Sequence, residues 1–187
     1  MTSSTGRSLL ELTEGADMRG LAAAGLGCLD RCLPLLAADR NDALRPVWAA
    51  VARADAAAWG EALGKALVEL DGPPAEPAGA AVRERLAAAP RDWTPEALRA
   101  WAADCSATAL DAHGRYDTAD LSEDLVERCR AGDPAGAGPL LAGELRRQLA
   151  VLDAVAHGPT GLRRARELSV EGGRVLRAVV SRRARTA

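Results

Sequence analysis

The chain has 187 residues, of which 48% are hydrophobic and 27% charged, a balance that excludes an intrinsically disordered protein. It contains no Ile and no Phe, and its apolar residues are mostly Ala and Leu, which favours helices over a large sheet. The net charge of −2 is unevenly placed: eight arginines against Glu167 and Glu171 give +6 over residues 161–187, which leaves −8 over residues 1–160.

The first half of the chain predicts two long helices. Apolar residues over 18–36 recur at three- and four-residue steps, and Pro34 is expected to kink or break that helix near its end. A longer apolar stripe predicts one helix near 42–70, which we expect to be the central helix of the fold. The Pro/Gly-rich segment 71–79 then predicts a loop, because it has three prolines and no large apolar residue.

The second half predicts several shorter helices. Thr94 and the proline after it are a typical helix start, and a Gly/Pro loop is expected at 131–139. The last helix carries the pair Gly172–Gly173, which indicates either a weak point or a close helix crossing, and it leads into a basic C-terminal end at 182–187. We therefore predict an all-α fold, an antiparallel helical bundle of about six or seven helices, in a single domain over 1–187.

Cys28 and Cys32 are candidate metal ligands. Their i, i+4 spacing places both thiols on one face of a helix, as half of a metal site would require. The same face carries leucines, so the alternative is that both cysteines pack in the core as small apolar residues. The spacing is not that of a typical zinc motif, and we favour core packing.

A pocket between helices is suggested by aromatic residues around one carboxylate. Asp55 lies seven residues after Trp48 and four before Trp59, so a continuous helix would point its side chain into the apolar stripe. A buried carboxylate is either paired or protonated, which makes Asp55 a candidate for binding or catalysis. The alternative, which we favour, is that an arginine of a neighbouring helix pairs with Asp55 or that its carboxylate reaches water. The expected walls of a ligand pocket are Trp48, Trp59 and Trp101.

The two histidines are each followed by glycine at the expected end of a helix. His113 and His157 therefore fit ordinary helix C-terminal capping, although two adjacent helix ends could bring them together as a general base pair. Arg115 and the only tyrosine, Tyr116, follow His113 in what we expect to be a loop. This loop is the expected mouth of a small-molecule pocket.

Common catalytic and cofactor motifs are absent from the sequence. It has no GxGxxG or phosphate loop, no HExxH and no GxSxG motif. We therefore predict a non-catalytic helical protein-interaction module that needs no cofactor. Two alternatives stay open: a small-molecule-binding protein or enzyme with its pocket near the His113/Tyr116 loop, and a thiol-based metal or redox protein.

The charge distribution and the lack of long apolar runs predict the kind of partner. We expect a protein partner or self-association, for example a homodimer, through the Arg-rich last helix or the helix near 42–70. A nucleic-acid partner is not expected, because the basic residues lie at one end and no aromatic side chain there could stack on bases. No apolar run could span a membrane and the N-terminus lacks a signal core, so we expect a cytoplasmic protein.

Overall fold

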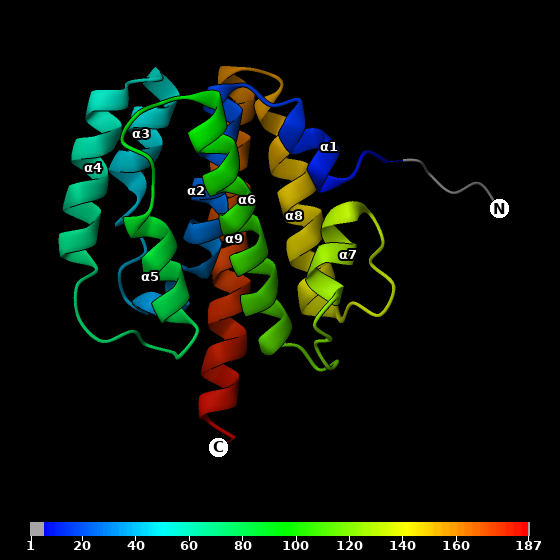
Figure 1. The fold of residues 1–187 in the computed structure, drawn as a ribbon. Coiled ribbons are helices and arrows are strands. Elements are labelled where there is room, and N and C mark those ends of the chain that lie inside the picture. Colours follow the sequence, from blue (N-terminus) through cyan, green and yellow to red (C-terminus); the bar gives the residue numbers. More distant parts are fainter. Residues whose placement is uncertain (1–5, 187) are drawn as a thin grey trace.

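The fold consists of helices. A computed structural model describes residues 6–186, and within that range it contains nine helices and no strand, which confirms the predicted all-α class (Figure 1). Residues 1–5 and Ala187, on which part of the predictions for the N-terminus and the basic end fall, lie outside the described residues. The helices are α1 (Leu9–Glu14), α2 (Met18–Leu36), α3 (Arg45–Arg53), α4 (Ala56–Glu69), α5 (Gly79–Ala87), α6 (Pro95–Arg115), α7 (Leu125–Ala131), α8 (Pro139–Val155) and α9 (Pro159–Ala184).

The segment 42–70 forms two helices, so the prediction of one long helix there is wrong. Helix α3 ends because Ala54 takes a left-handed conformation with φ of 50°, in which its N–H caps the last turn. Asp55 then begins α4, and its side chain accepts a hydrogen bond from the N–H of Ala58 at 2.9 Å. The apolar periodicity continues across this break, which is why the pattern did not reveal it.

Helix α2 lies at the centre of the fold, in the place predicted for the segment 42–70. It packs against α3, α5, α6, α8 and α9, and nearly every residue from Gly20 to Leu36 is buried. Its glycines allow close approach: a Cβ atom at Gly25 would lie 2.4 Å from the Trp101 ring. Pro34 lies in the last turn of α2 and does not break it, since the helix continues for two more residues.

Of the four core helices α2, α6, α8 and α9, the three helices α2, α6 and α9 run in the same direction. Residues that meet across α2 and α6, and across α2 and α9, advance together along both helices: Gly25 with Trp101, Cys32 with His113, Gly27 with Ser169, and Arg31 with Gly172. Helix α8 runs the opposite way, because its residue Gln148 meets Ser106 of α6 whereas its earlier residue Glu144 meets the later His113.

The predicted antiparallel bundle of six or seven helices is therefore only partly correct. Helix α8 is antiparallel to its neighbours, but α2, α6 and α9 are mutually parallel, and residues 6–186 contain nine helices. The physical reason is the odd number of helices between α2 and α6. Helices α3, α4 and α5 return the chain to the end of the molecule where α2 began, so α6 starts in the same direction as α2 (Figure 1).

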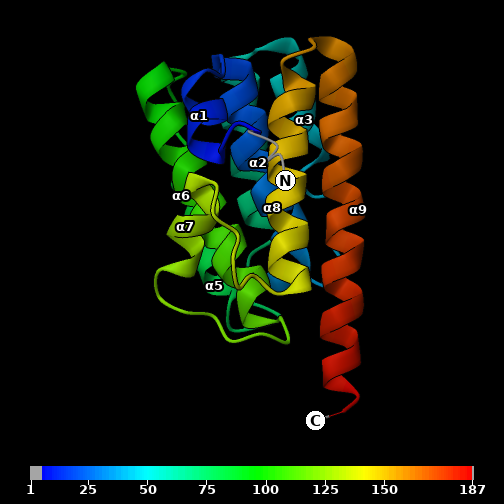
Figure 2. The same ribbon diagram turned by 90° about the vertical axis from the view of Figure 1, so that its right-hand side faces the viewer.

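Helix α9 extends beyond the other helices at its C-terminal end (Figure 2). Leu176 is its last buried residue, and the two turns after it are half-buried or exposed. Within residues 6–186, no helix combines the length and apolar character that a membrane span needs. The long final helix thus presents much of its surface to solvent, and this surface is strongly basic.

Candidate functional site

A network of polar side chains is buried where α2, α6, α8 and α9 meet. At its centre Arg31 of α2 pairs with Glu144 of α8, and both are fully buried. Nε and Nη2 of the guanidinium donate to the carboxylate oxygens at 2.8–3.0 Å, the forked geometry that Arg favours. Nη1 donates to Ser169 Oγ of α9 at 3.2 Å, and Gln148 donates to Glu144 at 2.8 Å. These bonds satisfy groups whose burial would otherwise be costly.

His113 belongs to this network and lies in the last turn of α6, the helix end at which it was expected; Arg115, expected in the loop, is also helical, so the loop begins at Tyr116. His113 is 1% exposed within α6, where Nδ1 donates to the carbonyl of Ala109 at 2.8 Å. Nε2 lies 3.6 Å from the Glu144 carboxylate and has no hydrogen-bond partner among the described residues. Burial lowers the pKa of His113, so the imidazole is neutral at pH 7. Burial is the largest single influence on Glu144 and opposes its charge, but the attraction of Arg31 together with the other favourable effects, among them hydrogen bonds from Arg31 and Gln148, outweighs it, so the pKa of Glu144 lies below its ordinary value.

The network is closely packed and buried. The small cavity beside Gln148 and Cys28 has a volume of about 10 Å³, enough for about one water molecule. Helix α9 crosses α2 closely at this level, and a Cβ atom at Gly172 would lie 2.5 Å from the Arg31 side chain. The Gly172–Gly173 pair therefore marks a close helix crossing, one of the two predicted possibilities.

Cys28 and Cys32 are buried at the edge of the same network. Cys28 Sγ accepts from Arg31 at 3.4 Å, and Cys32 Sγ lies 4.0 Å from Nδ1 of His113. Burial raises the pKa of the Cys28 thiol to about 12 and that of Cys32 well above its ordinary value, so both stay protonated. In the described part of the chain, no cluster of three or more His, Cys, Asp or Glu side chains has the arrangement of a metal site.

The tryptophans predicted to wall a pocket are core residues. Trp59 packs edge-on against Trp101 with ring centroids 5.6 Å apart, and Trp93 joins them at 5.8 Å from Trp59. Trp48 lies elsewhere, beside α9, and its Nε1 donates to Asp30 at 2.8 Å. Burial raises the pKa of Asp30 to about 6, although this bond opposes the shift. The structure thus brings Trp59 and Trp101 together and leaves Trp48 apart.

Asp55 and His157 serve local helix capping. Asp55 is half-buried as the N-cap of α4 and does not point into a pocket, because the helix breaks immediately before it. His157 is exposed after the end of α8, where its Nδ1 donates to the carbonyl of Asp153 at 2.8 Å. His113 meets Glu144 near the opposite end of α8, thirteen residues earlier than His157, or about 20 Å along a helix. The structure does not bring the two histidines together.

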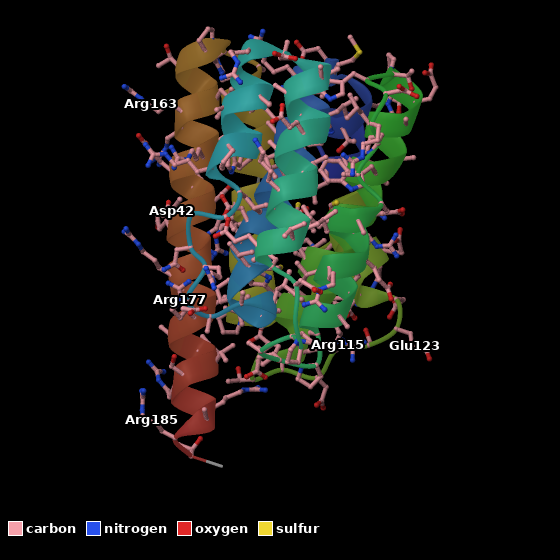
Figure 3. All side chains as sticks on the ribbon, turned by 90° about the vertical axis from the view of Figure 1, so that its left-hand side faces the viewer. Asp42, Arg115, Glu123, Arg163, Arg177 and Arg185 are labelled. Carbon is pink, nitrogen blue, oxygen red and sulfur yellow. The ribbon has the colours of Figure 1, made fainter. Side chains whose placement is uncertain are left out.

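A line of arginines follows the side of α9 that faces α3. We call it the arginine strip; it consists of Arg45 of α3 and Arg163, Arg166, Arg174 and Arg177 of α9 (Figure 3). These residues line two hollows of about 270 and 50 Å³. Trp48 and Leu162 contribute apolar surface to the larger hollow, and Val170 contributes to the smaller one. The strip is therefore a basic surface with apolar depressions.

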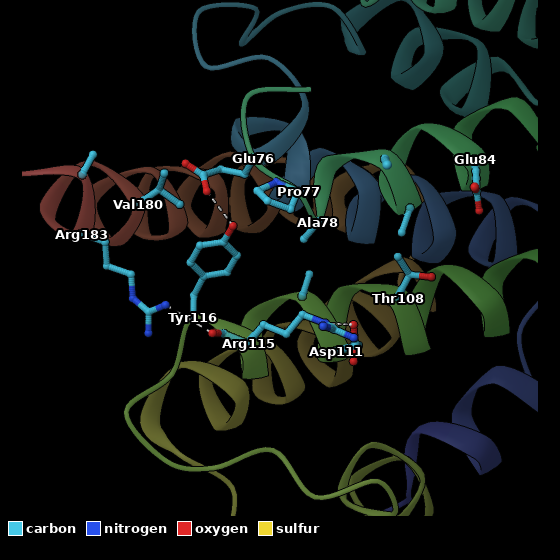
Figure 4. Close-up of a pocket in the computed structure, with 14 residues that line it drawn as sticks. Glu76, Pro77, Ala78, Glu84, Thr108, Asp111, Arg115, Tyr116, Val180 and Arg183 are labelled. Atoms are coloured by element: carbon cyan, nitrogen blue, oxygen red, sulfur yellow. Dashed lines mark hydrogen bonds and ion pairs between the residues drawn. The ribbon is translucent and has the colours of Figure 1, made fainter. Parts of the chain in front are cut away.

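An open groove with a volume of about 950 Å³ lies at the C-terminal end of α6 (Figure 4). We call it the α5–α6–α9 groove, after the helices that contribute its walls. Tyr116, the C-cap of α6, donates to Glu76 at 2.9 Å, and the Arg183 guanidinium of α9 lies 5.3 Å from the Tyr116 ring. Burial raises the pKa of Tyr116 to about 12, and the bond to Glu76 adds to the shift. Arg115, also in the groove, pairs with Asp111 at 2.6 Å.

The groove contains Tyr116 and Arg115 but none of the tryptophans expected as pocket walls. Of the buried network, His113, Cys28 and Cys32 were candidates from sequence, whereas Arg31, Glu144, Gln148 and Ser169 were not. The Arg-rich last helix was expected as an interface, but without its individual arginines. The sequence contains a pattern that indicates the network: Glu144 and Gln148 occupy the same helical stripe as the apolar residues Leu141, Leu145 and Leu152, which points to their burial. A signal for the strip existed as well, since Arg163, Arg166, Arg174 and Arg177 recur at helical spacing.

Comparison with known proteins adds no family to these observations. Neither the family models, nor the curated proteins, nor the solved structures include one that matches this chain.

Proposed function

We propose that this chain is a helical protein-interaction module that binds an acidic segment of a partner protein along the arginine strip. The observation that carries the proposal is the excess of positive charge there. Five arginines line the two hollows, and among residues 6–186 the one carboxylate in their lining is Asp30, which already accepts from Trp48. Asp42 lies on the neighbouring loop and only partly offsets this charge (Figure 3).

The arginines of the strip are largely free to bind an external acid. Within the described residues, Arg163 has a carboxylate partner, Glu167, at 3.9 Å, but both side chains are exposed and the pair is weak. Arg177 donates to the side-chain oxygen of Asn41, a neutral group. Carboxylates of a partner would therefore add charge-assisted hydrogen bonds without displacing strong internal pairs.

The shape of the strip favours a peptide segment. From Arg163 to Arg177 the helix advances fourteen residues, or about 21 Å, which is the length of about four helical turns. The larger hollow, with Trp48 and Leu162 in its lining, can take one or two apolar side chains, and the arginines flank it on α3 and α9. The partner segment is thus expected to combine carboxylates with apolar anchor residues, as in helix-in-groove recognition.

A protein partner fits this surface better than a nucleic acid. The first 160 residues carry a charge of −8, which repels a polyphosphate chain that extends beyond the strip. The strip offers no exposed aromatic ring for base stacking, because Trp48 is only 4% exposed. Apolar hollows between the arginines contribute affinity only to a ligand with apolar side chains.

The test is a binding assay with a defined probe. A fluorescently labelled helical peptide of Glu and Leu at helical spacing is titrated with the full chain and followed by anisotropy. We expect binding that the variant R163E/R174E weakens at least tenfold, because it reverses two exposed charges of the strip. The control variant R146E/R164E makes the same change in net charge outside the two hollows and should bind as the parent chain does.

The proposal fails if both variants lose affinity equally, since binding would then reflect net charge alone. It also fails if a DNA duplex of similar length binds more tightly than the peptide at physiological salt, which would assign the strip to nucleic acid.

A further inference from the structure

The end of α9 and the α5–α6–α9 groove are unpartnered surfaces that lie next to each other. After Leu176 no residue of α9 is buried. The last turns are attached to the rest of the molecule through Val179 and Val180, which pack half-buried against the core, and through Arg183, which donates to the backbone carbonyls of Arg115 and Asp117. Val180 and Ala184 face the groove from this free end of α9 (Figure 4). The groove therefore has one wall that projects beyond the bundle.

The opposite wall of the groove carries uncompensated negative charge. Glu84 of α5 is exposed and has no salt-bridge partner among the described residues. Among residues 6–186 Glu76 accepts the neutral hydroxyl of Tyr116 and has no salt bridge, while Asp111 is already paired with Arg115; Arg183 adds one positive charge to the lining. Small apolar residues such as Ala81 and Ala112 lie between these charges. The groove thus fits a ligand with an apolar stripe flanked by cations.

The free end of α9 itself carries both an apolar stripe and cations. Val180 and Ala184 form an apolar stripe, and Arg182 and Arg185 are exposed without carboxylate partners within residues 6–186. We propose that the end of α9 from a second copy of this chain occupies the α5–α6–α9 groove. In this arrangement each copy inserts its own helix end into the groove of the other, which gives a closed twofold dimer.

The twofold arrangement covers two apolar surfaces at once, the α5–α6–α9 groove and the apolar face at the end of α9. The face of α9 that lines its own groove, with Val180 and Ala184, meets the same face of the second copy across the symmetry axis. The arginines beyond this face then approach Glu76 and Glu84 of the other copy. Charge complementarity between the helix end, with Arg182, Arg183 and Arg185 and no carboxylate, and the acidic wall of the groove favours this pairing and opposes contact between two helix ends alone.

The oligomeric state of the full chain tests the proposal. Sedimentation velocity over a range of concentrations should show a monomer–dimer equilibrium that weakens as salt is added. The variants E84R and R182E/R185E change exposed residues, so both should keep the parent helix content, and each should raise the dimer dissociation constant at least tenfold. An equimolar mixture of the two variants should recover the dimer, because every groove then faces a helix end of opposite charge.

Three outcomes would overturn the proposal. The first is a parent chain that stays monomeric at its highest soluble concentration. The second is a pair of variants that dimerise as tightly as the parent, and the third is a mixture of the two variants that stays monomeric. The result is independent of the peptide assay above, since R182E/R185E lies outside the hollows of the arginine strip and R163E/R174E lies outside the groove.

Discussion

At the scale of single residues, the pair of Arg31 and Glu144 is the most constrained feature of the molecule. Both charges are withdrawn from water, so each depends on the other and on Ser169 and Gln148 for its hydrogen bonds. Such a pair specifies how α2, α8 and α9 fit together. Its net contribution to stability can be small, whereas the loss of one partner is costly.

Replacing Glu144 by Gln should therefore destabilise the protein by about 3–5 kcal/mol, because the Arg31 charge stays buried without its counter-charge. The double variant R31M/E144L removes both charges and should lose less unfolding free energy than E144L alone. Urea unfolding followed by circular dichroism measures both effects. A cost below about 1 kcal/mol for E144Q would mean that water reaches Arg31 after all.

His113 should make stability depend on pH. Its pKa is lowered in the folded chain by burial, so the unfolded chain binds more protons in weak acid. The contribution of His113 is complete above its ordinary pKa of about 6.5 and is lost as the pH falls toward its folded pKa. Between about pH 7 and 5, the H113Q variant should lose less stability than the parent in urea unfolding. Equal slopes for the two proteins would contradict burial of a neutral imidazole.

Asp30 should make stability depend on pH in the direction opposite to His113. Burial raises its pKa from 3.8 to about 6, so the folded chain binds the extra proton and stability is lost as the pH rises through this range. The variant D30N keeps an acceptor for Trp48 and removes the charge. It should be more stable than the parent by about 2 kcal/mol at pH 8, a difference that disappears near pH 4. Thermal unfolding at the two pH values checks both the sign and the window.

At the scale of helices, local rules explain where most of them begin. Ser8, Asp17, Asp55 and Thr94 each cap the N-terminus of a helix with the side chain, and proline occupies the first turn of α3, α6, α8 and α9. Of these start signals, only Thr94 with the proline after it was predicted from the sequence. The break before Asp55 was missed because Ala54 carries no sign of its left-handed conformation.

Ala54 offers a direct test of this break. Glycine adopts a positive φ without the steric cost of a Cβ atom, so A54G should stabilise the protein by about 0.5 kcal/mol despite the greater freedom of the unfolded chain. The matched control A52G, at an exposed helical position of α3, should instead cost about 1 kcal/mol. If both variants destabilise equally in urea unfolding, α3 and α4 form one helix in solution.

At the scale of the whole molecule, α9 divides into a packed part and a projecting part. The helix is buried at intervals up to Leu176, with Ser169 in the buried network, whereas in the last turns Val179 and Val180 are only half-buried against the core and Arg183 lies over Tyr116. The strip lies on the packed part and the groove contact on the projecting part, so the two proposed interfaces can be separated by mutation.

Removing residues 178–187 should accordingly leave the fold intact. Because the deletion takes away only half-buried and exposed side chains, we expect a loss of less than about 2 kcal/mol and a decrease of a few degrees in Tm. Thermal unfolding by circular dichroism measures this. Complete loss of cooperative unfolding would show that the projecting turns belong to the core.

The sequence by itself determined the helical class, the starts of α2 and α6 and the basic character of the last helix, because propensity, capping and charge act between residues close in the chain. Only the tertiary structure decided the direction of α6 and α9 relative to α2 and the burial of Arg31 with Glu144. These depend on contacts between residues 113 positions apart, and the free energy of such contacts is set by packing that no local pattern records.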